Sequence, residues 1–276
     1  MRKLSRQTVR KRFGQHFLEP AWVDKVIRAI DPKPDELFIE IGPGRGALTR
    51  PLVERAMAVT AYEIDRDLAA DLRAAAIPAV TVVEGDFLEA APNVERRTPN
   101  GSVRVAGNLP YNVASPILFK LVELYALGVP LVDATVMLQR EVANRLTAAP
   151  GSRPYGVLSI LIRRHASAEL ILKLPPGAFR PPPAVKSALV RLRFHAPRPP
   201  VQDSATFVGL VQAVFTRRRK TLANALLAYE GSVAASSPAE ALAAADLDGS
   251  RRPETLSIAE FARLADVYAG KRSAML

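Results

Sequence analysis

A glycine-rich segment follows the first strand-like run of the chain. The apolar residues 37–41 lead into Gly42, Gly44 and Gly46, and a helix-forming segment comes next. Because glycine has no Cβ, the backbone N–H groups of such a turn and the N-terminus of the helix can approach a ligand closely. With Ala47 the segment also matches the dinucleotide pattern G-x-G-x-x-G/A, so a nicotinamide cofactor must be considered.

Acidic residues end the next two strand-like runs. Glu63 comes 21 residues after Gly42, where a carboxylate can accept hydrogen bonds from the hydroxyls of a ribose. Asp86 follows the third run and can accept from an adenine amino group, while Phe87 can lie near the ring. Both NAD and S-adenosylmethionine carry an adenosine. Three successive strand ends therefore predict one nucleoside site.

The fourth strand-like run ends in Asn108-Leu109-Pro110-Tyr111, which could serve a reaction at an amine. If that amine is the exocyclic amine of an adenine, its lone pair is delocalised into the ring. Groups that accept hydrogen bonds from the amine would make this lone pair available for reaction. The side-chain oxygen of Asn108 and a main-chain carbonyl held rigid by Pro110 are two such acceptors, and Tyr111 offers a stacking face. A sulfonium methyl donor is already activated, so alignment can replace a strong general base. The tetrapeptide therefore predicts methylation of an amine.

The segments that must position these residues alternate between strand and helix. Periodicity and turn signals predict strands over residues 37–41, 58–62, 80–84, 103–107, 134–138 and 187–194, and helices over residues 21–30, 47–55, 67–76 and 116–124. This alternation predicts an α/β fold with a doubly wound parallel sheet. Such sheets bind ligands at the carboxyl ends of their strands, where the residues described above would gather.

Prolines and charge divide the chain into three parts. Pro197, Pro199 and Pro200 favour an extended linker, so we expect an α/β domain over residues 13–196 and a small helical domain over residues 201–276. Apolar spacing predicts helices in the latter over residues 205–229, 238–245 and 257–268, the last opened by Ser257 and Glu260. Residues 1–12 are cationic without periodicity and predict a flexible basic arm.

The composition of the chain excludes several classes of protein. Its 276 residues are 49% hydrophobic, carry a formal net charge of +11 and include no cysteine. The lack of cysteine excludes disulfides, thiolate metal sites and thiol nucleophiles, and we expect no metal site. Six basic and no acidic residues among the first 13 indicate an anionic partner of the nucleic-acid type. No apolar run is long enough to span a membrane, and we expect a cytoplasmic monomer.

Five segments of the sequence resemble the ribosomal RNA adenine dimethylase family, above all its bacterial small-subunit branch. They are residues 10–18 (RKRFGQHFL), 40–49 (EIGPGRGALT), 107–112 (GNLPYN), 179–187 (FRPPPAVKS) and 215–222 (FTRRRKTL). The resemblance implies a Rossmann-like class I S-adenosylmethionine-dependent methyltransferase sheet with a small C-terminal helical domain. It also implies N6,N6-dimethylation of two adjacent adenines in the 3′-terminal hairpin loop of 16S rRNA, within a 30S assembly intermediate.

The resemblance also implies roles for residues at matched positions. Cofactor contacts would fall on His16, Leu18, Gly42, Gly44, Glu63, Asp86 and Asn108. The catalytic pocket for the target adenine would be formed by Asn108, Leu109, Pro110, Tyr111 and Phe179. Because a stacked adenine must be extruded to react, we expect Tyr111 and Phe179 to hold it between them. The family often has asparagine at the position of His16, where an imidazole offers one donor and one acceptor.

Two basic clusters are expected to bind RNA phosphates. The first consists of Arg10, Lys11 and Arg12, in the arm. The second consists of Arg217, Arg218, Arg219 and Lys220, which would span one turn of the predicted helix over residues 205–229. Four consecutive residues of one helical turn cannot all face a core, so we expect this cluster to lie at the surface.

Three other functions fit parts of the sequence. A dehydrogenase would use the glycine segment but gives no reason for the Asn-Leu-Pro-Tyr segment or the basic arm. A large-subunit (23S) rRNA adenine N6-methyltransferase would share the family. A non-catalytic ribosome assembly or transcription factor could keep the fold without the reaction, although the intact set of Glu63, Asp86 and Asn108 argues against it.

Overall fold

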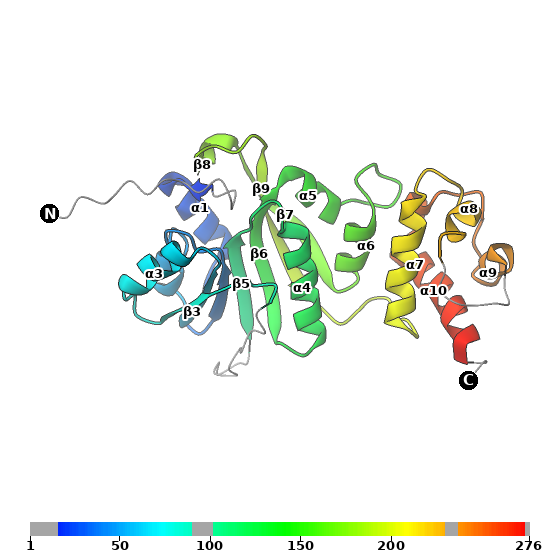
Figure 1. Cartoon of the computed structure of the whole chain (residues 1–276), viewed down its shortest axis with the longest axis horizontal. Coiled ribbons are helices and arrows are strands. Elements are labelled where there is room, and N and C mark those ends of the chain that lie inside the picture. The colour runs from blue at the N-terminus through cyan, green and yellow to red at the C-terminus, as the bar shows by residue number, and fades with distance from the viewer. Residues whose placement is uncertain (1–15, 90–101, 230–236, 274–276) are drawn as a thin grey trace. The chain divides into compact units, whose positions relative to one another are not determined.

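The computed structural model of the chain describes residues 16–89, 102–229 and 237–273 (Figure 1). It contains two compact units. The α/β unit comprises residues 1–143 and 168–194, and the helical unit comprises residues 144–167 and 195–276. No helix within the described ranges is long and apolar enough to cross a membrane.

A seven-stranded sheet forms the centre of the α/β unit. Its strands are β2 (Leu37–Ile41), β3 (Ala58–Glu63), β4 (Val80–Glu84), β5 (Val103–Asn108), β6 (Leu131–Gln139), β7 (Ala166–Leu174) and β9 (Ser187–Phe194), in the order β4-β3-β2-β5-β6-β9-β7. The strands from β4 to β6 run parallel, and β9 pairs antiparallel with β6. The predicted doubly wound α/β fold is therefore confirmed. The order reverses between β2 and β5, which is the switch point where such sheets bind ligands.

Short elements complete the α/β unit. Its helices are α1 (Pro20–Ile30), α2 (Thr49–Val53), α3 (Arg66–Ala74), α4 (Ala114–Ala126) and the first part of α5 (Arg140–Leu146). A two-stranded sheet pairs β1 (Phe17–Leu18) antiparallel with β8 (Phe179–Arg180), just after the 3₁₀ turn η2 (Pro176–Ala178). The strand β7 was not predicted, because it lies at the edge of the sheet and its mixed polarity gives no clear alternation.

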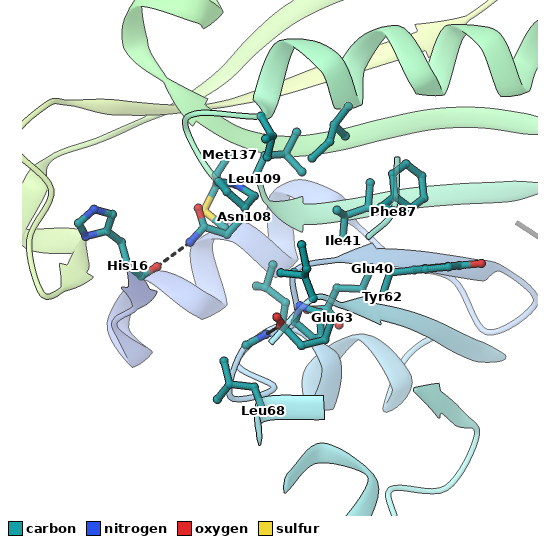
Figure 2. Close-up of a pocket in the computed structure, with 18 of the residues that line it drawn as sticks. His16, Glu40, Ile41, Tyr62, Glu63, Leu68, Phe87, Asn108, Leu109 and Met137 are labelled. Atoms are coloured by element: carbon teal, nitrogen blue, oxygen red, sulfur yellow. Dashed lines mark hydrogen bonds between the residues drawn. The ribbon is translucent and has the colours of Figure 1, made fainter. Parts of the chain in front are cut away.

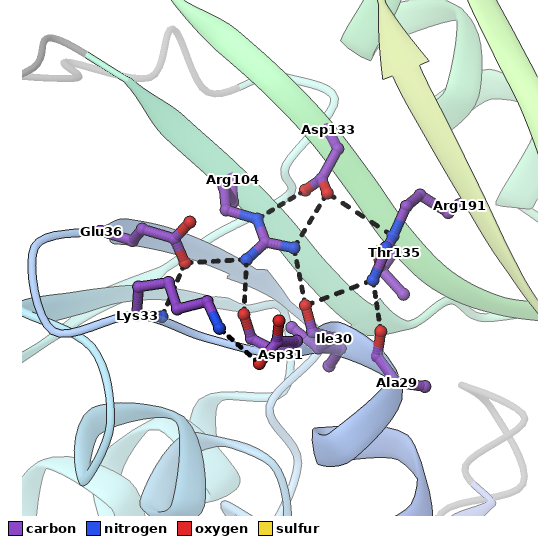
Figure 3. A network of polar contacts seen from close by, with 9 residues as sticks. All are labelled: Ala29, Ile30, Asp31, Lys33, Glu36, Arg104, Asp133, Thr135 and Arg191. Atoms are coloured by element: carbon purple, nitrogen blue, oxygen red, sulfur yellow. Dashed lines mark hydrogen bonds and ion pairs between the residues drawn. The ribbon is translucent and has the colours of Figure 1, made fainter.

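A buried network of ion pairs and hydrogen bonds joins the C-terminal end of α1 to strands β5, β6 and β9 (Figure 3). Arg104 of β5 donates from Nε and Nη2 to the two carboxylate oxygens of Asp133, both at 2.9 Å. The same guanidinium donates to the carbonyl oxygens of Ile30 (2.7 Å) and Asp31 (3.1 Å). Arg191 of β9 donates to the carbonyl of Ile30 as well (3.3 Å). These bonds satisfy carbonyls that the end of a helix leaves without partners.

The helical unit has its own apolar core. Its helices are α6 (Val157–Arg163), α7 (Ser204–Thr216), α8 (Leu222–Leu226), α9 (Pro238–Ala244) and α10 (Ile258–Ser273), with the 3₁₀ turn η3 (Pro253–Thr255). Phe207 of α7 and Phe261 of α10 are fully buried in this core. The predicted capping box at Ser257 and Glu260 is confirmed, since each side chain accepts from the backbone N–H of the other residue.

The division of the chain differs from the expected one. Residues 144–167 were expected in the α/β domain, but they belong to the helical unit, where Tyr155 and Ile160 are buried in the core. The hydroxyl of Tyr155 donates to the carbonyl oxygen of Leu256 at 2.9 Å. Prolines in the sequence mark a linker near residue 197, but they cannot reveal that an earlier segment of the chain joins the same core.

The prediction of one continuous helix over residues 205–229 is wrong in the middle of that range. The structure has α7 and α8 with a turn between them at residues 217–221, so the four basic residues of the cluster do not lie on one helical turn. The backbone N–H of Leu222 instead donates to the carbonyl oxygen of Arg251 at 2.6 Å. A tertiary hydrogen bond thus replaces the helical one at this point.

Arg104 should contribute strongly to stability because it compensates a buried carboxylate. Replacing Arg104 with Met would leave Asp133, which is 6% exposed, with the longer ion pair to Arg191 at 3.6 Å as its one ion pair among the described residues. We expect the free energy of unfolding to fall by about 3 kcal/mol, measured by urea denaturation. The control Arg66→Met removes an exposed ion pair and should cost less than about 0.5 kcal/mol. Equal losses in the two variants would contradict this role of Arg104.

Candidate active site

A cavity lies at the carboxyl ends of the parallel strands (Figure 2). Its lining comes from residues 16–18, 40–44, 47–48, 62–64, 68, 85–87 and 108–113, together with Ile117 and Met137. The walls are mainly apolar, and three carboxylates interrupt them, those of Glu40, Glu63 and Asp86. The switch point of the sheet therefore carries a concave site with a few convergent polar groups, which is the usual form of a small-molecule site.

Every predicted cofactor contact lies in the wall of this cavity. His16, Leu18, Gly42, Gly44, Glu63, Asp86 and Asn108 all line it. The glycine turn has left-handed backbone at Gly42 (φ 69°) and Gly44 (φ 57°), as the sequence indicated. The N–H of Gly44 donates to Glu63 Oε2 at 2.9 Å, so the carboxylate that ends β3 also holds the turn that follows β2.

Gly107 was not assigned a role from the sequence, yet it sets the distance between the two central strands. It lies opposite Ile41 in the pairing of β2 with β5. A Cβ at this position would lie 2.4 Å from the carbonyl oxygen of Ile41, which real side chains do not allow. Only glycine lets the end of β5 come this close, and the next residue is Asn108.

Glu63 and Asp86 are held by backbone donors. Glu63 is 4% exposed, and its second carboxylate oxygen accepts from the N–H of Asp65 at 2.9 Å. Burial raises the pKa of the Glu63 carboxyl, and the two backbone hydrogen bonds oppose this by favouring the charged form. Asp86 accepts from the N–H of Leu88 at 2.9 Å. Both carboxylates are therefore fixed in orientation at the wall of the cavity.

Asn108 is oriented by a hydrogen bond from its amide group. Its Nδ2 donates to the carbonyl oxygen of His16 at 2.7 Å (Figure 2). A carbonyl oxygen accepts only from a donor, so the nitrogen side of the amide faces His16 and Oδ1 is the end left to accept another hydrogen bond. The next three residues of the predicted pocket, Leu109, Pro110 and Tyr111, line the same cavity.

His16 and Tyr111 form a ring pair. Their centroids are 5.6 Å apart and their planes differ by 27°. His16 Nδ1 donates to the carbonyl oxygen of Pro181 at 2.8 Å, and the Tyr111 hydroxyl bonds Ser187 Oγ at 2.7 Å. The loop between β8 and β9 and the first residue of β9 therefore fix the orientation of both rings.

Phe179 does not lie where the sequence placed it. Its ring is 1% exposed, packs in the apolar core with Leu18 and Met137, and does not line the cavity. In this structure the ring of Phe179 therefore offers no face to the cavity. The ring instead anchors β8 to β1, and the aromatic group found beside Tyr111 is His16.

Glu40 is a buried acid for which the sequence predicted no role. It is 1% exposed, lines the cavity, and has no hydrogen-bond partner for Oε2 among the described residues. Burial raises the pKa of its carboxyl to about 7, and the nearby charge of Glu63 acts in the same direction. The available signal was an acid in an otherwise apolar strand, directly before the glycine turn.

The predicted RNA-binding residues do not line the cavity within the described part of the chain. Arg10, Lys11 and Arg12 lie outside the described residues. In the turn between α7 and α8, Arg217, Arg219 and Lys220 are exposed. Arg218 is half-buried, donates to the carbonyl oxygen of Arg153 at 2.7 Å, and lies 3.6 Å from Glu254. Three of these four side chains thus remain at the surface.

A parallel sheet that carries a glycine turn and acidic strand ends at its switch point is typical of Rossmann-like class I methyltransferases, and enzymes of this class use S-adenosylmethionine. The described site fits an adenosine-bearing cofactor, since Gly42 and Gly44 keep the approach open and the carboxylates of Glu63 and Asp86 face the cavity. A family model described as "Ribosomal RNA adenine dimethylase" matches residues 6–268. The chain belongs to this family of rRNA adenine dimethyltransferases.

Individual relatives agree with this family. The chain is 46% identical over 218 residues to "Ribosomal RNA small subunit methyltransferase A" of Leptothrix cholodnii, and the match covers 79% of each protein. It is 44% identical over 264 residues to the protein of the same name from Chromohalobacter salexigens, with 93% of this chain and 90% of the relative covered. A dimethyladenosine transferase from Plasmodium falciparum is a structural neighbour, with a TM-score of 0.76 and 25% identity. The match covers 93% of this chain and 98% of that chain. The 23S rRNA methyltransferase ErmE has a TM-score of 0.67 at 28% identity, and the match covers 92% of this chain and 99% of that chain.

The raised pKa of Glu40 predicts how pH affects stability. The unfolded chain should titrate this group near its ordinary value of 4.5, and the folded chain near 7, so the folded state binds the proton more tightly between these values. The contribution of Glu40 to the free energy of unfolding therefore falls as pH rises through this window. Glu40→Gln cannot ionise, and its advantage over the unsubstituted protein should grow between pH 5 and pH 8 by up to about 3 kcal/mol.

Urea denaturation of both proteins at the two pH values measures this advantage. The control is Glu84→Gln, which makes the same substitution at an exposed side chain outside the cavity. Its difference from the unsubstituted protein should not follow the same window. An advantage of Glu40→Gln that is independent of pH would mean that Glu40 is already ionised in the folded protein at pH 5.

Proposed function

We propose that this chain transfers methyl groups from S-adenosylmethionine to the N6 amines of two adjacent adenines in the 3′-terminal hairpin loop of 16S rRNA, during assembly of the small ribosomal subunit. The observation that carries the proposal is the orientation of Asn108. Its amide nitrogen is bound to the carbonyl of His16, so Oδ1 can accept from an amine at the carboxyl edge of the sheet.

The residues at this edge support three tasks. S-adenosylmethionine supplies an activated methyl group on a sulfonium. Glu63 and Asp86 accept hydrogen bonds from the ribose and the adenine of that cofactor, and their backbone bonds keep them aligned. Asn108 Oδ1 and the adjacent main-chain carbonyl accept from the target amine, which frees its lone pair, and Tyr111 packs against the extruded base. None of these tasks requires a strong general base.

The names of the relatives favour the small-subunit substrate over the alternatives. Relatives at 40–46% identity are named small subunit methyltransferases, whereas the 23S rRNA enzyme is 28% identical. A dehydrogenase leaves the family match unexplained. A non-catalytic factor would not need the oriented amide of Asn108. We therefore favour 16S rRNA within a 30S assembly intermediate as substrate, and a monomeric enzyme in the bacterial cytoplasm.

The decisive experiment is transfer of labelled methyl groups to 30S particles that lack the modification. We expect incorporation at two adjacent adenines near the 3′ end of 16S rRNA, mapped by primer extension. Incorporation into 23S rRNA alone would support the large-subunit function instead. Absence of transfer to either RNA, with S-adenosylmethionine bound, would support the non-catalytic factor.

Asn108→Ala tests the acceptor role. We expect kcat to fall by about 100-fold or more, because an oriented acceptor at the reacting amine is lost. The matched control is Asn112→Ala, which removes the same type of side chain from the turn that follows β5 and from the same cavity wall. Single-turnover methyl transfer measures both, after thermal unfolding confirms that each protein is folded. A near-normal rate for Asn108→Ala would contradict the role.

The exposed basic residues of the helical unit are proposed to bind RNA phosphates. Replacing Arg217, Arg219 and Lys220 together with Ala should weaken binding to 30S particles whatever the sequence of the target loop. The slope of log K against log salt should flatten by about 2 to 3, because each lost phosphate contact removes just under one unit. The control replaces three other exposed arginines, namely Arg28, Arg50 and Arg55. An unchanged slope in the first variant would remove this surface from the RNA interface.

A further inference from the structure

The cavity has the opposite charge from the rest of the chain. The protein has a formal net charge of +11, yet three acids line the cavity and no lysine or arginine is found among the described residues of its wall. Among the described residues of the wall, His16 is the only one with a basic side chain. A carboxylate-lined, mostly apolar enclosure favours a ligand with positive charge, since charges interact more strongly there than in water.

Glu40 differs from the other two acids because one of its carboxylate oxygens has no hydrogen-bond partner in the described structure. Both oxygens of Glu63 accept backbone N–H groups, and Asp86 accepts one. Glu40 Oε2 has no partner among the described residues. The hydroxyl of Thr49 is close enough to lower the pKa of Glu40, but the geometry falls short of a hydrogen bond and Oγ1 also has no partner there. Such a group is costly to bury, so its retention in a ligand cavity suggests a role toward the ligand.

We propose that Glu40 makes the cavity sensitive to the charge on the cofactor sulfur, so that the site holds the sulfonium of S-adenosylmethionine more tightly than the neutral thioether of S-adenosylhomocysteine. This inference rests on the proposed function. Methyl transfer removes one positive charge from the cofactor, and an ionised Glu40 then loses part of its compensation. Loss of the methyl group thereby weakens binding of the spent cofactor. That effect helps an enzyme that must exchange its cofactor for each of four methyl groups.

The two ligands allow this effect to be isolated. They share the adenosine, the ammonium and the carboxylate, and they differ in one methyl group and one charge. The titratable groups that line the cavity with Glu40 are Glu63 and Tyr62 from β3, Asp86 after β4, His16 before β1 and Tyr111 after β5, and of these the charge of Glu63 acts on Glu40. A bound sulfonium favours ionisation of Glu40, so a proton should be released when S-adenosylmethionine binds near pH 7, and less of one when S-adenosylhomocysteine binds.

Calorimetric titration of the full-length protein tests the proposal. The ratio of the Kd for S-adenosylhomocysteine to that for S-adenosylmethionine should fall by about tenfold in Glu40→Gln, because the variant lacks the charge that favours the sulfonium. Sinefungin has an amine-bearing carbon in place of the sulfonium, and it should lose affinity in this variant as S-adenosylmethionine does. The control Glu84→Gln should leave the ratio unchanged, because Glu84 is paired with Arg73 outside the cavity.

Proton release provides a second measurement on the unsubstituted protein. Titrations in two buffers of different ionisation enthalpy should give more proton release with S-adenosylmethionine than with S-adenosylhomocysteine. Equal release for the two ligands would overturn the proposal even if Glu40→Gln failed to fold. An unchanged Kd ratio in a folded Glu40→Gln would also overturn it and leave the proposed function intact, because both ligands would still bind. Failure of the unsubstituted protein to bind either ligand would refute the proposed function itself.

Discussion

The close pairing of β2 with β5 at Gly107 is the constraint on which the site depends. A side chain at this position would run into the carbonyl of Ile41, so only glycine permits the register that brings the two strand ends together. One strand end continues into the glycine turn, and the other continues into Asn108. The glycine turn and Asn108 therefore lie in the wall of one cavity.

A buried charge network stabilises the opposite end of the sheet. Arg104 and Asp133 form a buried bidentate pair that also holds the last carbonyls of α1 (Figure 3). The chain enters α1 from β1, and the carbonyl of His16 just before β1 orients Asn108. A well-compensated charge network thus lies at the amino ends of the strands. At their carboxyl ends, by contrast, Glu40 Oε2 has no hydrogen-bond partner among the described residues and is available for a cationic ligand.

The sequence predicted the cavity residues well because they follow strands. The positions after parallel strands meet at one edge whatever the details of packing, so the order of residues along the chain was enough to place the glycine turn, Glu63, Asp86 and Asn108 together. The burial of Phe179 could not be predicted, because an aromatic residue in a Pro-rich loop can face either a ligand or the core. Here the pairing of β8 with β1 turns it inward. The break after α7 was missed because local periodicity does not report the hydrogen bond between Leu222 and Arg251.

The sequence by itself determined the α/β class, the order of most strands along the chain and the adenosine chemistry of the site. Hydrophobic period, turn residues and strand-end acids are local properties, and they remain readable in the linear chain. Only the tertiary structure decided that residues 144–167 join the helical core, that His16 stacks on Tyr111, and that Glu40 Oε2 is buried without a partner among the described residues. Each of these depends on contacts between distant segments, and burial and charge compensation follow from such contacts rather than from the identity of one residue.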